Sequence, residues 1–126
     1  MNNKILLVDD DEGILDAFKA MLESMDYDVV TSADGEVLLN LSNENLPRLI
    51  ILDVLLSGQD GRVLCKRLKS DPITKNVPII MVSAHPTAQY DMPACGADDF
   101  LKKPFEMGDM IQKVERFWTR QQHSLQ

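Results

Sequence analysis

The chain has 126 residues, 44% of them hydrophobic and 26% charged, which fits one globular domain over residues 1–126 with a core at about 4–120 and a polar tail at 121–126. Its formal net charge of −7 argues against a nucleic-acid-binding surface, and no apolar run approaches the roughly 18 residues of a membrane span. Because the N-terminus leads directly into a strand-like run and not into a signal peptide, we expect a cytoplasmic protein.

Short apolar runs of strand length alternate along the chain with segments of helical periodicity. This alternation predicts an α/β fold, a doubly wound three-layer α/β/α sandwich around a five-stranded parallel sheet. The expected strands are, in chain order, residues 4–8, 27–31, 49–52, 77–82 and 99–102. The expected helices are residues 12–25, 36–43, 63–69 and 106–120.

The stretch 84–95, between the last two expected strands, contains Pro86 and Pro93. A proline inside a helix removes a hydrogen-bond donor and clashes with the preceding turn. We therefore expect the fourth helix to be short or irregular.

The two cysteines, Cys65 and Cys95, lie far apart in the sequence, and neither has a second cysteine nearby. This spacing indicates neither a zinc knuckle nor a redox pair. It predicts two buried or half-buried thiols.

Residues with functional side chains stand where the predicted strands end. They are, in strand order, Asp9 and Asp10 (first strand), Asp53 (third), Ser83 (fourth) and Lys103 (fifth). Because the carboxyl ends of parallel strands meet at one edge of a sheet, we expect these side chains to share one crevice. Three gathered carboxylates repel one another, and Mg²⁺, a hard cation that prefers oxygen ligands, is the expected compensation.

Asp53 is the candidate nucleophile for phosphoryl transfer. A carboxylate is already deprotonated at neutral pH, so its attack needs in-line placement and neutralised charge, not a general base. Lys103 would pair with Asp53 before the reaction and with the phosphoryl oxygens afterwards, and the Ser83 hydroxyl could donate to one of them. Taken singly, Asp9 and Asp10 could cap a helix and Asp53 could be a loop acid, so the prediction depends on their joint placement.

Four motifs carry these residues: ILLVDDDEGI, IILDVLLSGQDG, VPIIMVSA and GADDFLKKPF. With them the chain closely resembles, over about residues 4–120, the receiver domains of two-component response regulators. The resemblance implies the flavodoxin-like (βα)5 fold with strand order 2-1-3-4-5. It also implies a signalling function, in which a phosphoryl group is accepted and the conformation switches to control a partner protein.

The resemblance implies a phosphoryl acceptor at Asp53 and a Mg²⁺ site. The direct ligands would be the side chains of Asp10 and Asp53 and the backbone carbonyl of Leu55, with Asp9 acting largely through water. The domain would be a stoichiometric acceptor with slow self-hydrolysis, not a turnover enzyme.

The resemblance also implies which residues switch. Ser83 matches the Ser/Thr that moves toward the phosphoryl group, and Phe100 matches the aromatic switch residue. Lys103 precedes a proline that the family holds in the cis form, so Pro104 is a cis candidate.

The implied partners are a histidine kinase or histidine phosphotransfer protein as donor and a downstream protein as target. No direct nucleic-acid contact and no membrane insertion are expected, and the domain would be a monomer or a phosphorylation-dependent dimer. Two alternatives stay open: a phosphorylation-independent pseudo-receiver that only binds, and a receiver cut from a hybrid kinase or a transcription regulator. A metal-dependent hydrolase would need a dedicated acid or base and a capping insertion, and the sequence indicates neither. Dinucleotide binding would need a Gly-x-Gly-x-x-Gly motif after the first strand, and none follows it.

The chain departs from the usual receiver pattern near the acceptor. Ser57 stands where the family usually has proline, which we expect to loosen the loop without touching the essential chemistry. Leu55 and His85 occupy variable positions that flank the site; the apolar Leu55 should hinder water and lengthen the life of the phosphoryl group, whereas His85 is interpreted as a loop residue. The stretch 84–95 is about two residues shorter than in the family, which should alter the signalling face.

Overall fold

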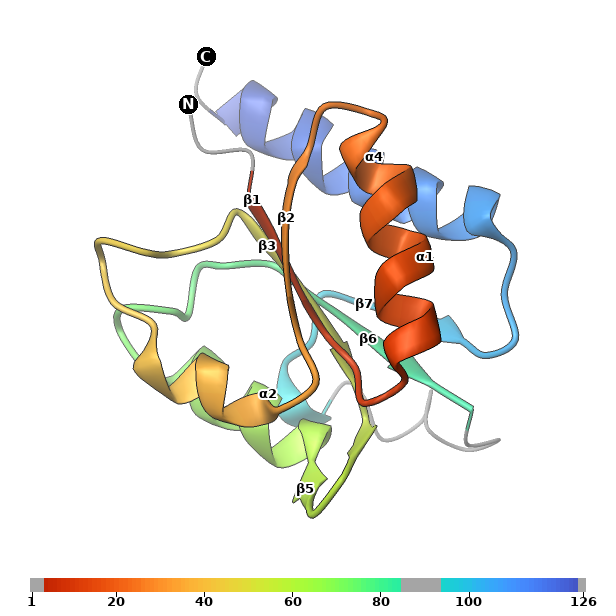
Figure 1. Cartoon of the computed structure of the whole chain (residues 1–126). Helices are drawn as coiled ribbons and strands as arrows, with labels where there is room; N and C mark the ends of the chain where they lie inside the picture. The colour runs from red at the N-terminus through yellow and green to blue at the C-terminus, as the bar shows by residue number, and fades with distance from the viewer. Residues whose placement is uncertain (1–3, 85–93, 125–126) are drawn as a thin grey trace.

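The computed structural model describes residues 4–84 and 94–124, and its centre is a five-stranded parallel sheet (Figure 1). The strands are β1 (Lys4–Val8), β2 (Asp28–Ser32), β3 (Leu49–Asp53), β6 (Ile79–Ser83) and β7 (Asp99–Lys102). They are hydrogen-bonded in the order β2-β1-β3-β6-β7. Counted along the chain this is the order 2-1-3-4-5, so the predicted doubly wound fold is confirmed.

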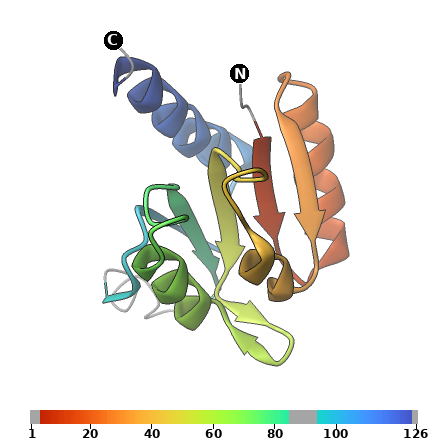
Figure 2. The ribbon, with the colours of Figure 1, turned by 90° about the vertical axis from the view of Figure 1, so that its left-hand side faces the viewer.

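Helices cover both faces of the sheet and make the three layers (Figures 1 and 2). One face packs against α1 (Glu12–Glu23) and α4 (Met107–Ser124), the other against the 3₁₀ helix η1 (Gly35–Asn40) and α2 (Gly61–Ser70). No helix in the described part of the chain is both long and apolar enough to cross a membrane.

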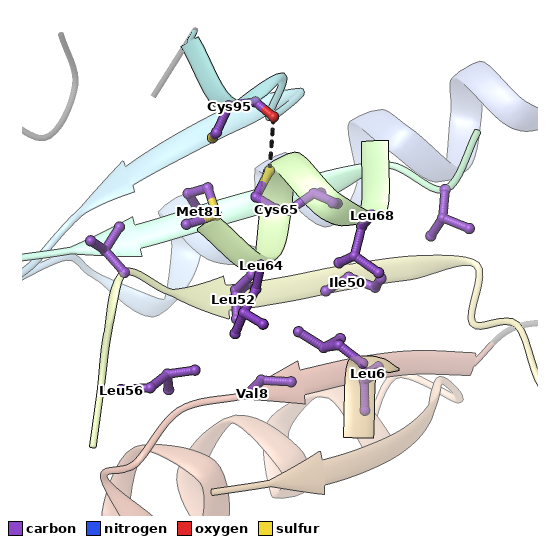
Figure 3. Packing of buried hydrophobic residues seen from close by; sticks show 14 residues of the cluster. Leu6, Val8, Ile50, Leu52, Leu56, Leu64, Cys65, Leu68, Met81 and Cys95 are labelled. Carbon is purple, nitrogen blue, oxygen red and sulfur yellow. Dashed lines mark hydrogen bonds between the residues drawn. The ribbon is translucent and has the colours of Figure 1, made fainter. Parts of the chain in front are cut away.

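The central strands are apolar throughout because both of their faces are covered. Ile5 and Leu7 of β1 point into the cluster under α1 and α4, whereas Leu6 and Val8 point into the cluster under η1 and α2. Figure 3 shows this second cluster, in which side chains of β1 and β3 pack below Leu64 and Leu68 of α2, among other residues. The alternation fixes the register, so the strand ends are placed accurately at one edge of the sheet.

Aspartates cap the helices that begin at this edge. Asp11 Oδ1 accepts hydrogen bonds from the backbone N–H groups of Gly13 (3.0 Å) and Ile14 (3.2 Å) and so begins α1. Asp60 Oδ1 accepts from the N–H of Arg62 (2.9 Å) and begins α2. Such caps satisfy amide groups that have no partner inside the helix. Of the three consecutive aspartates that follow β1, Asp11 therefore has a structural role.

Three features differ from the expectations. The segment expected as a helix at 36–43 is the shorter 3₁₀ helix η1, which packs so tightly that a Cβ on Gly35 would lie 2.6 Å from Gln59 Oε1 and from Leu64 Cδ1. The sequence pattern also missed a two-stranded hairpin, β4 (Leu55–Leu56) with β5 (Gln59–Asp60). Individual strand ends differ by one or two residues from the expected bounds. The expectation for the fourth helix falls mostly outside the described residues, as does His85.

Both cysteines are free and buried, as the sequence predicted. Cys65 on α2 lies beside Cys95, with its thiol 3.5 Å from the Cys95 carbonyl oxygen (Figure 3). Burial, together with the neighbouring Cys95 thiol, raises the pKa of Cys65 far above its usual range. A thiol held in its protonated form is unreactive, so we interpret Cys65 as a packing residue.

Candidate functional site

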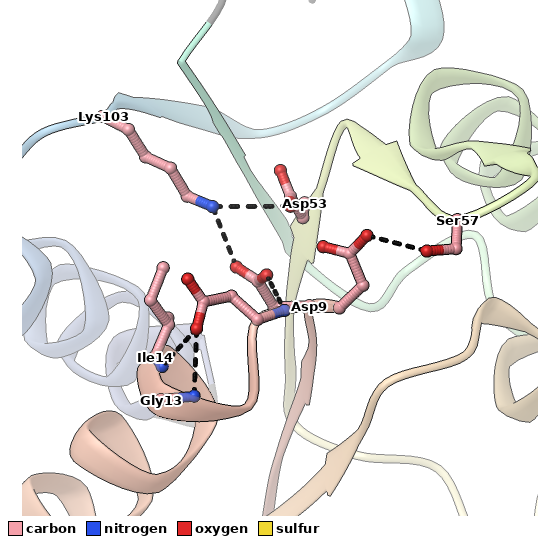
Figure 4. Close-up of polar contacts among 8 residues, drawn as sticks. Asp9, Gly13, Ile14, Asp53, Ser57 and Lys103 are labelled. Carbon is pink, nitrogen blue, oxygen red and sulfur yellow. Dashed lines mark hydrogen bonds and ion pairs between the residues drawn. The ribbon is translucent and has the colours of Figure 1, made fainter.

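Three carboxylates gather where β1 and β3 end. Asp9 and Asp10 directly follow β1, and Asp53 is the last residue of β3; the register pairs Val8 with Leu52 and so brings the two strand ends level. One oxygen from each of the three aspartates lies within 4.8 Å of the others. The predicted convergence of Asp9, Asp10 and Asp53 is therefore present in the structure (Figure 4).

Lys103 supplies the positive charge of this site. Its Nζ lies 3.1 Å from Asp9 Oδ2 and 3.4 Å from Asp53 Oδ2, and its side chain is only 19% exposed. The backbone N–H of Lys103 donates to the Ser83 carbonyl (2.8 Å), which extends the pairing of β6 with β7 and places the side chain over the carboxylates. The Lys103–Pro104 peptide bond is cis, as predicted.

The two buried carboxylates differ in their surroundings. Asp9 is 3% exposed and has both oxygens engaged, Oδ1 by the N–H of Asp11 (2.9 Å) and Oδ2 by Lys103. Asp53 is 6% exposed and accepts hydrogen bonds from Lys103 and from the backbone N–H of Leu55. Both oxygens of Asp9 are thus already hydrogen-bonded within the protein.

Burial and the charge of Asp9 raise the pKa of Asp53 to about 6, although Lys103 and the N–H of Leu55 act to lower it. For Lys103, burial acts to lower the pKa, but the hydrogen bond to Asp9 and the charges of Asp53 and Asp9 outweigh it, so the pKa is raised. Lys103 is thus firmly protonated, and one lysine does not fully compensate two buried carboxylates. A divalent cation would complete the compensation, and an all-oxygen donor set is what Mg²⁺ prefers.

A model of the response regulator receiver domain matches residues 5–115 of the chain. The chain is a response regulator receiver domain. Its sequence is 37% identical over 123 residues to the alkaline phosphatase synthesis transcriptional regulatory protein PhoP of Bacillus subtilis, covering 95% of this chain. The chain spans 50% of the length of that regulator. The domain belongs to two-component signalling, as the resemblance implied.

Solved receiver structures share the fold. The receiver domain of a Francisella response regulator is 31% identical, with a TM-score of 0.84, and the match covers 95% of this chain and 99% of that one. The receiver domain of a sensor histidine kinase from Pseudomonas aeruginosa is 28% identical, with a TM-score of 0.80 and coverage of 93% and 98%. In that structure a magnesium ion is coordinated in the active site cleft.

Of the remaining predicted residues, Ser83 and Leu55 lie at this edge and Phe100 lies further back in the sheet. Ser83 is the buried last residue of β6, one position beyond Val82, which pairs with Asp53. Leu55 begins β4, and its side chain is 60% exposed. Phe100 of β7 pairs with Met81 and packs against the cluster under α2, so it lies set back from the carboxylates.

Two residues contact the site in ways that the sequence did not predict: Ser57 was expected to loosen the loop without touching the essential chemistry, and Gly61 was given no part in the site. Ser57, at the hairpin turn, donates a hydrogen bond from Oγ to Asp10 Oδ2 (3.1 Å). Gly61 donates its N–H to the Val54 carbonyl (2.7 Å), and a Cβ there would lie 2.2 Å from the Asp53 carbonyl oxygen. The DG pair before a helical run marks Gly61 as a turn position, but nothing in the sequence shows which strand it approaches.

An apolar groove of about 620 Å³ opens beside Lys103, between α1 and the segment that joins β7 to α4. Its lining includes Ile14 and Phe18 of α1, then Pro104, Phe105 and Met107. The rings of Phe18 and Phe105, which both line the groove, stack with centroids 5.3 Å apart. An apolar surface therefore borders the charged site.

Proposed function

We propose that this receiver domain accepts one phosphoryl group on Asp53 from a phosphohistidine of a histidine kinase or phosphotransfer protein. The observation that carries the proposal is the placement of Asp53, nearly buried, beside two further carboxylates and 3.4 Å from the ammonium group of Lys103. A carboxylate in such a site is an oxygen nucleophile whose products can be charge-stabilised on the spot.

The chemistry follows from these side chains. A carboxylate oxygen of Asp53 attacks phosphorus, the new O–P bond forms, and the P–N bond to the donor imidazole breaks. Lys103 pairs with Asp53 beforehand and can follow the charge onto the phosphoryl oxygens. Ser83, at the end of β6, would donate its hydroxyl to the same group. We regard the domain as a stoichiometric acceptor and not as a turnover enzyme.

A Mg²⁺ ion is part of the proposal. The side chains of Asp10 and Asp53 and the backbone carbonyl of Leu55 would hold it, with Asp9 acting through water. When bound, it neutralises carboxylate charge and would contact phosphoryl oxygens. The raised pKa of Asp53 and the oxygen donor set of this chain support a cation here. The magnesium ion in the Pseudomonas aeruginosa receiver domain supports the choice of metal.

The apolar groove beside Lys103 suits the donor protein. A donor must bring its phosphohistidine to Asp53, so it has to cover the surface next to the site. The groove between α1 and Phe105 offers apolar contact there, and an amphipathic helix of the donor is the occupant we propose.

Phosphorylation would then be read by a downstream protein through Ser83 and Phe100, which link the site to β6 and β7. A monomer or a phosphorylation-dependent dimer, no direct nucleic-acid contact, no membrane insertion and a cytoplasmic location remain our predictions. The activity of any longer protein that carries this domain is a separate question, because the chain spans half the length of its Bacillus subtilis relative.

The deciding experiment is the intact mass of the protein after incubation with Mg²⁺ and a small acyl-phosphate or phosphoramidate donor. We expect a gain of about 80 Da, one phosphoryl group, in the wild type and in the control Asp16→Asn, an exposed helix residue. The gain should be absent from Asp53→Ala. An adduct that survives Asp53→Ala would contradict the proposal.

Rapid hydrolysis could hide the adduct, so binding of beryllofluoride, a phosphoryl mimic, is the second measurement. Saturable binding that requires Mg²⁺ and Asp53 supports the acceptor. If neither an adduct nor beryllofluoride binding is observed, the pseudo-receiver alternative is favoured, in which the domain only binds its partners.

A further inference from the structure

Figure 2 shows the hairpin of β4 and β5 that follows the acceptor strand β3, and Ser57 lies in the turn between its two strands. The strands of this hairpin pair Leu55 with Asp60 and Leu56 with Gln59, which leaves Ser57 and Gly58 as a two-residue turn. Gly58 has φ +72°, a left-handed conformation that glycine adopts without steric cost and that the second central position of a type II turn requires. The position of Ser57 is therefore set by the geometry of the turn.

The hairpin is fixed to the rest of the domain at three points. The Leu56 side chain is only 6% exposed and belongs to the core cluster under α2. Gln59 Oε1 accepts a hydrogen bond from the N–H of Gly35 (3.0 Å), and Asp60 caps α2. Because these contacts do not involve Ser57, they hold the turn beside the acidic site whether or not Ser57 forms a bond of its own.

From this place the Ser57 hydroxyl reaches the metal candidate Asp10. The Oγ–Oδ2 distance is 3.1 Å between residues 47 positions apart in the sequence (Figure 4). The buried carboxylates Asp9 and Asp53 are both held by Lys103, whereas Asp10 is exposed and receives a neutral hydroxyl donor. Each of the three carboxylates thus has a side chain that orients it.

We propose that Ser57 is a positioning residue for the cation site: its hydroxyl holds Asp10 toward Asp9 and Asp53 and thereby strengthens Mg²⁺ binding. This inference rests on the proposed function and deepens it. A proline at this position would have no hydroxyl to donate, so the contact depends on the serine of this chain.

The hydroxyl should strengthen metal binding and not compete with it. A carboxylate can accept several hydrogen bonds, so a bond at Oδ2 leaves Oδ1 of Asp10 for a cation. Without this bond, repulsion from Asp9 and Asp53 would turn the exposed Asp10 side chain into solvent, and the cation would have to bring it back. The hydroxyl adds no positive charge that would oppose the cation.

The test is the dissociation constant for Mg²⁺, measured from backbone amide chemical shifts as the metal is titrated into the protein. The matched pair is Ser57→Thr and Ser57→Val, whose side chains have the same shape and differ only in the hydroxyl. Ser57→Ala is a second variant without the hydroxyl, and Ser42→Ala, at a distant exposed serine, is the control. Removal of one charge-assisted hydrogen bond should raise the dissociation constant by about two- to tenfold in Ser57→Val and Ser57→Ala. Ser57→Thr and the control Ser42→Ala should stay within about twofold of wild type.

The outcomes separate the two proposals. If the wild type binds Mg²⁺ and Ser57→Val binds it as tightly as Ser57→Thr or more tightly, the inference on Ser57 is wrong and the proposed function stands. If the wild type shows no Mg²⁺ binding, both fail. The amide shifts of Gln59 and Asp60, measured without metal, report whether the hairpin is intact. Because threonine and valine side chains have the same shape, Ser57→Thr and Ser57→Val should disturb the turn equally. The comparison of these two variants therefore stays valid even if those shifts move.

Discussion

Lys103 Nζ lies 3.4 Å from Asp53 Oδ2, although Asp53 ends β3, Lys103 follows β7, and the two residues are 50 positions apart in the sequence. Their side chains are 19% and 7% exposed, so water screens the pair only weakly. The same ammonium group also bonds Asp9, so one lysine charge pairs with two buried carboxylates. This excess of negative charge should determine both the stability of the metal-free domain and its response to a metal cation.

Lys103→Met should destabilise the metal-free protein by about 1–3 kcal/mol, because it leaves two buried carboxylates without their partner. Unfolding by urea in the presence of a chelator measures the loss. Excess Mg²⁺ should recover part of it, since binding to the folded state alone stabilises that state and the cation replaces the missing charge. Phosphoryl incorporation should fall in the same variant.

The matched control is Lys102→Met, one position earlier and exposed, which should stay within about 0.5 kcal/mol of wild type. Equal losses in both variants, or a loss at Lys103 that Mg²⁺ does not reduce, would contradict the assigned role.

Asp53→Asn should stabilise the metal-free protein near neutral pH. The pKa of Asp53 is raised from 3.8 to about 6 on folding, so the folded state binds more protons than the unfolded state between these values. Stability therefore falls as the pH rises through this window, and the deprotonated Asp53 costs on the order of 1–3 kcal/mol above it. Unfolding by urea over a pH series, with a chelator, should show the advantage of Asn at about pH 7 and its loss toward about pH 4.

Saturating Mg²⁺ provides the control for this prediction. The cation binds the wild-type carboxylate, so the advantage of Asn near neutral pH should shrink or reverse when Mg²⁺ is present. An advantage that is the same at every pH would mean that charge at Asp53 is not its cause.

The layout of the site could be predicted from the sequence because the positions of its residues follow from the arrangement of strands in a parallel sheet. Asp53 and Lys103 each follow an apolar run, and in a parallel sheet the ends of such runs meet at one edge. The unbroken apolar β1 and β3 predicted a sheet covered on both faces, and this is observed. The strand order and the cis form of Pro104 came from the family resemblance and not from periodicity.

The contacts that depend on exact backbone paths were not predictable. The bond from Ser57 to Asp10 requires the hairpin turn, and two short strands of two residues each give no periodic pattern. The approach of Gly61 to Asp53 depends on the same turn. Likewise, the side chains of Gln59 and Leu64 lie against Gly35 at the start of η1, and the local sequence does not show this tertiary contact.

Gly61→Ala should destabilise the domain and weaken the site together. The new Cβ would lie 2.2 Å from the Asp53 carbonyl oxygen and 3.0 Å from Val54 Cα, and backbone atoms cannot move aside as a flexible side chain can. We expect a loss of about 1–3 kcal/mol in the free energy of unfolding, measured with urea, and a weaker Mg²⁺ affinity because the acceptor strand must shift.

Gly108→Ala is the control, since a Cβ there meets nothing within 4 Å and the residue lies in α4. Alanine in a helix is more favourable than glycine, so this variant should be unchanged or more stable by up to about 1 kcal/mol. A Gly61→Ala protein as stable as Gly108→Ala would show that the α2 terminus can move away from Asp53.

Leu55→Asn should shorten the life of the phosphoryl group. Leu55 lies two residues after the acceptor and is 60% exposed, and we expect its apolar side chain to keep water from Asp53 where an amide would bind water. A change of about 1 kcal/mol in the barrier to hydrolysis corresponds to roughly fivefold in rate. The rate of phosphate release after removal of the donor measures it, with Val63→Asn, 57% exposed on α2, as the control. Faster release from the wild type than from Leu55→Asn would refute the shielding role, because then the amide and not the apolar side chain would be keeping water from the acyl phosphate.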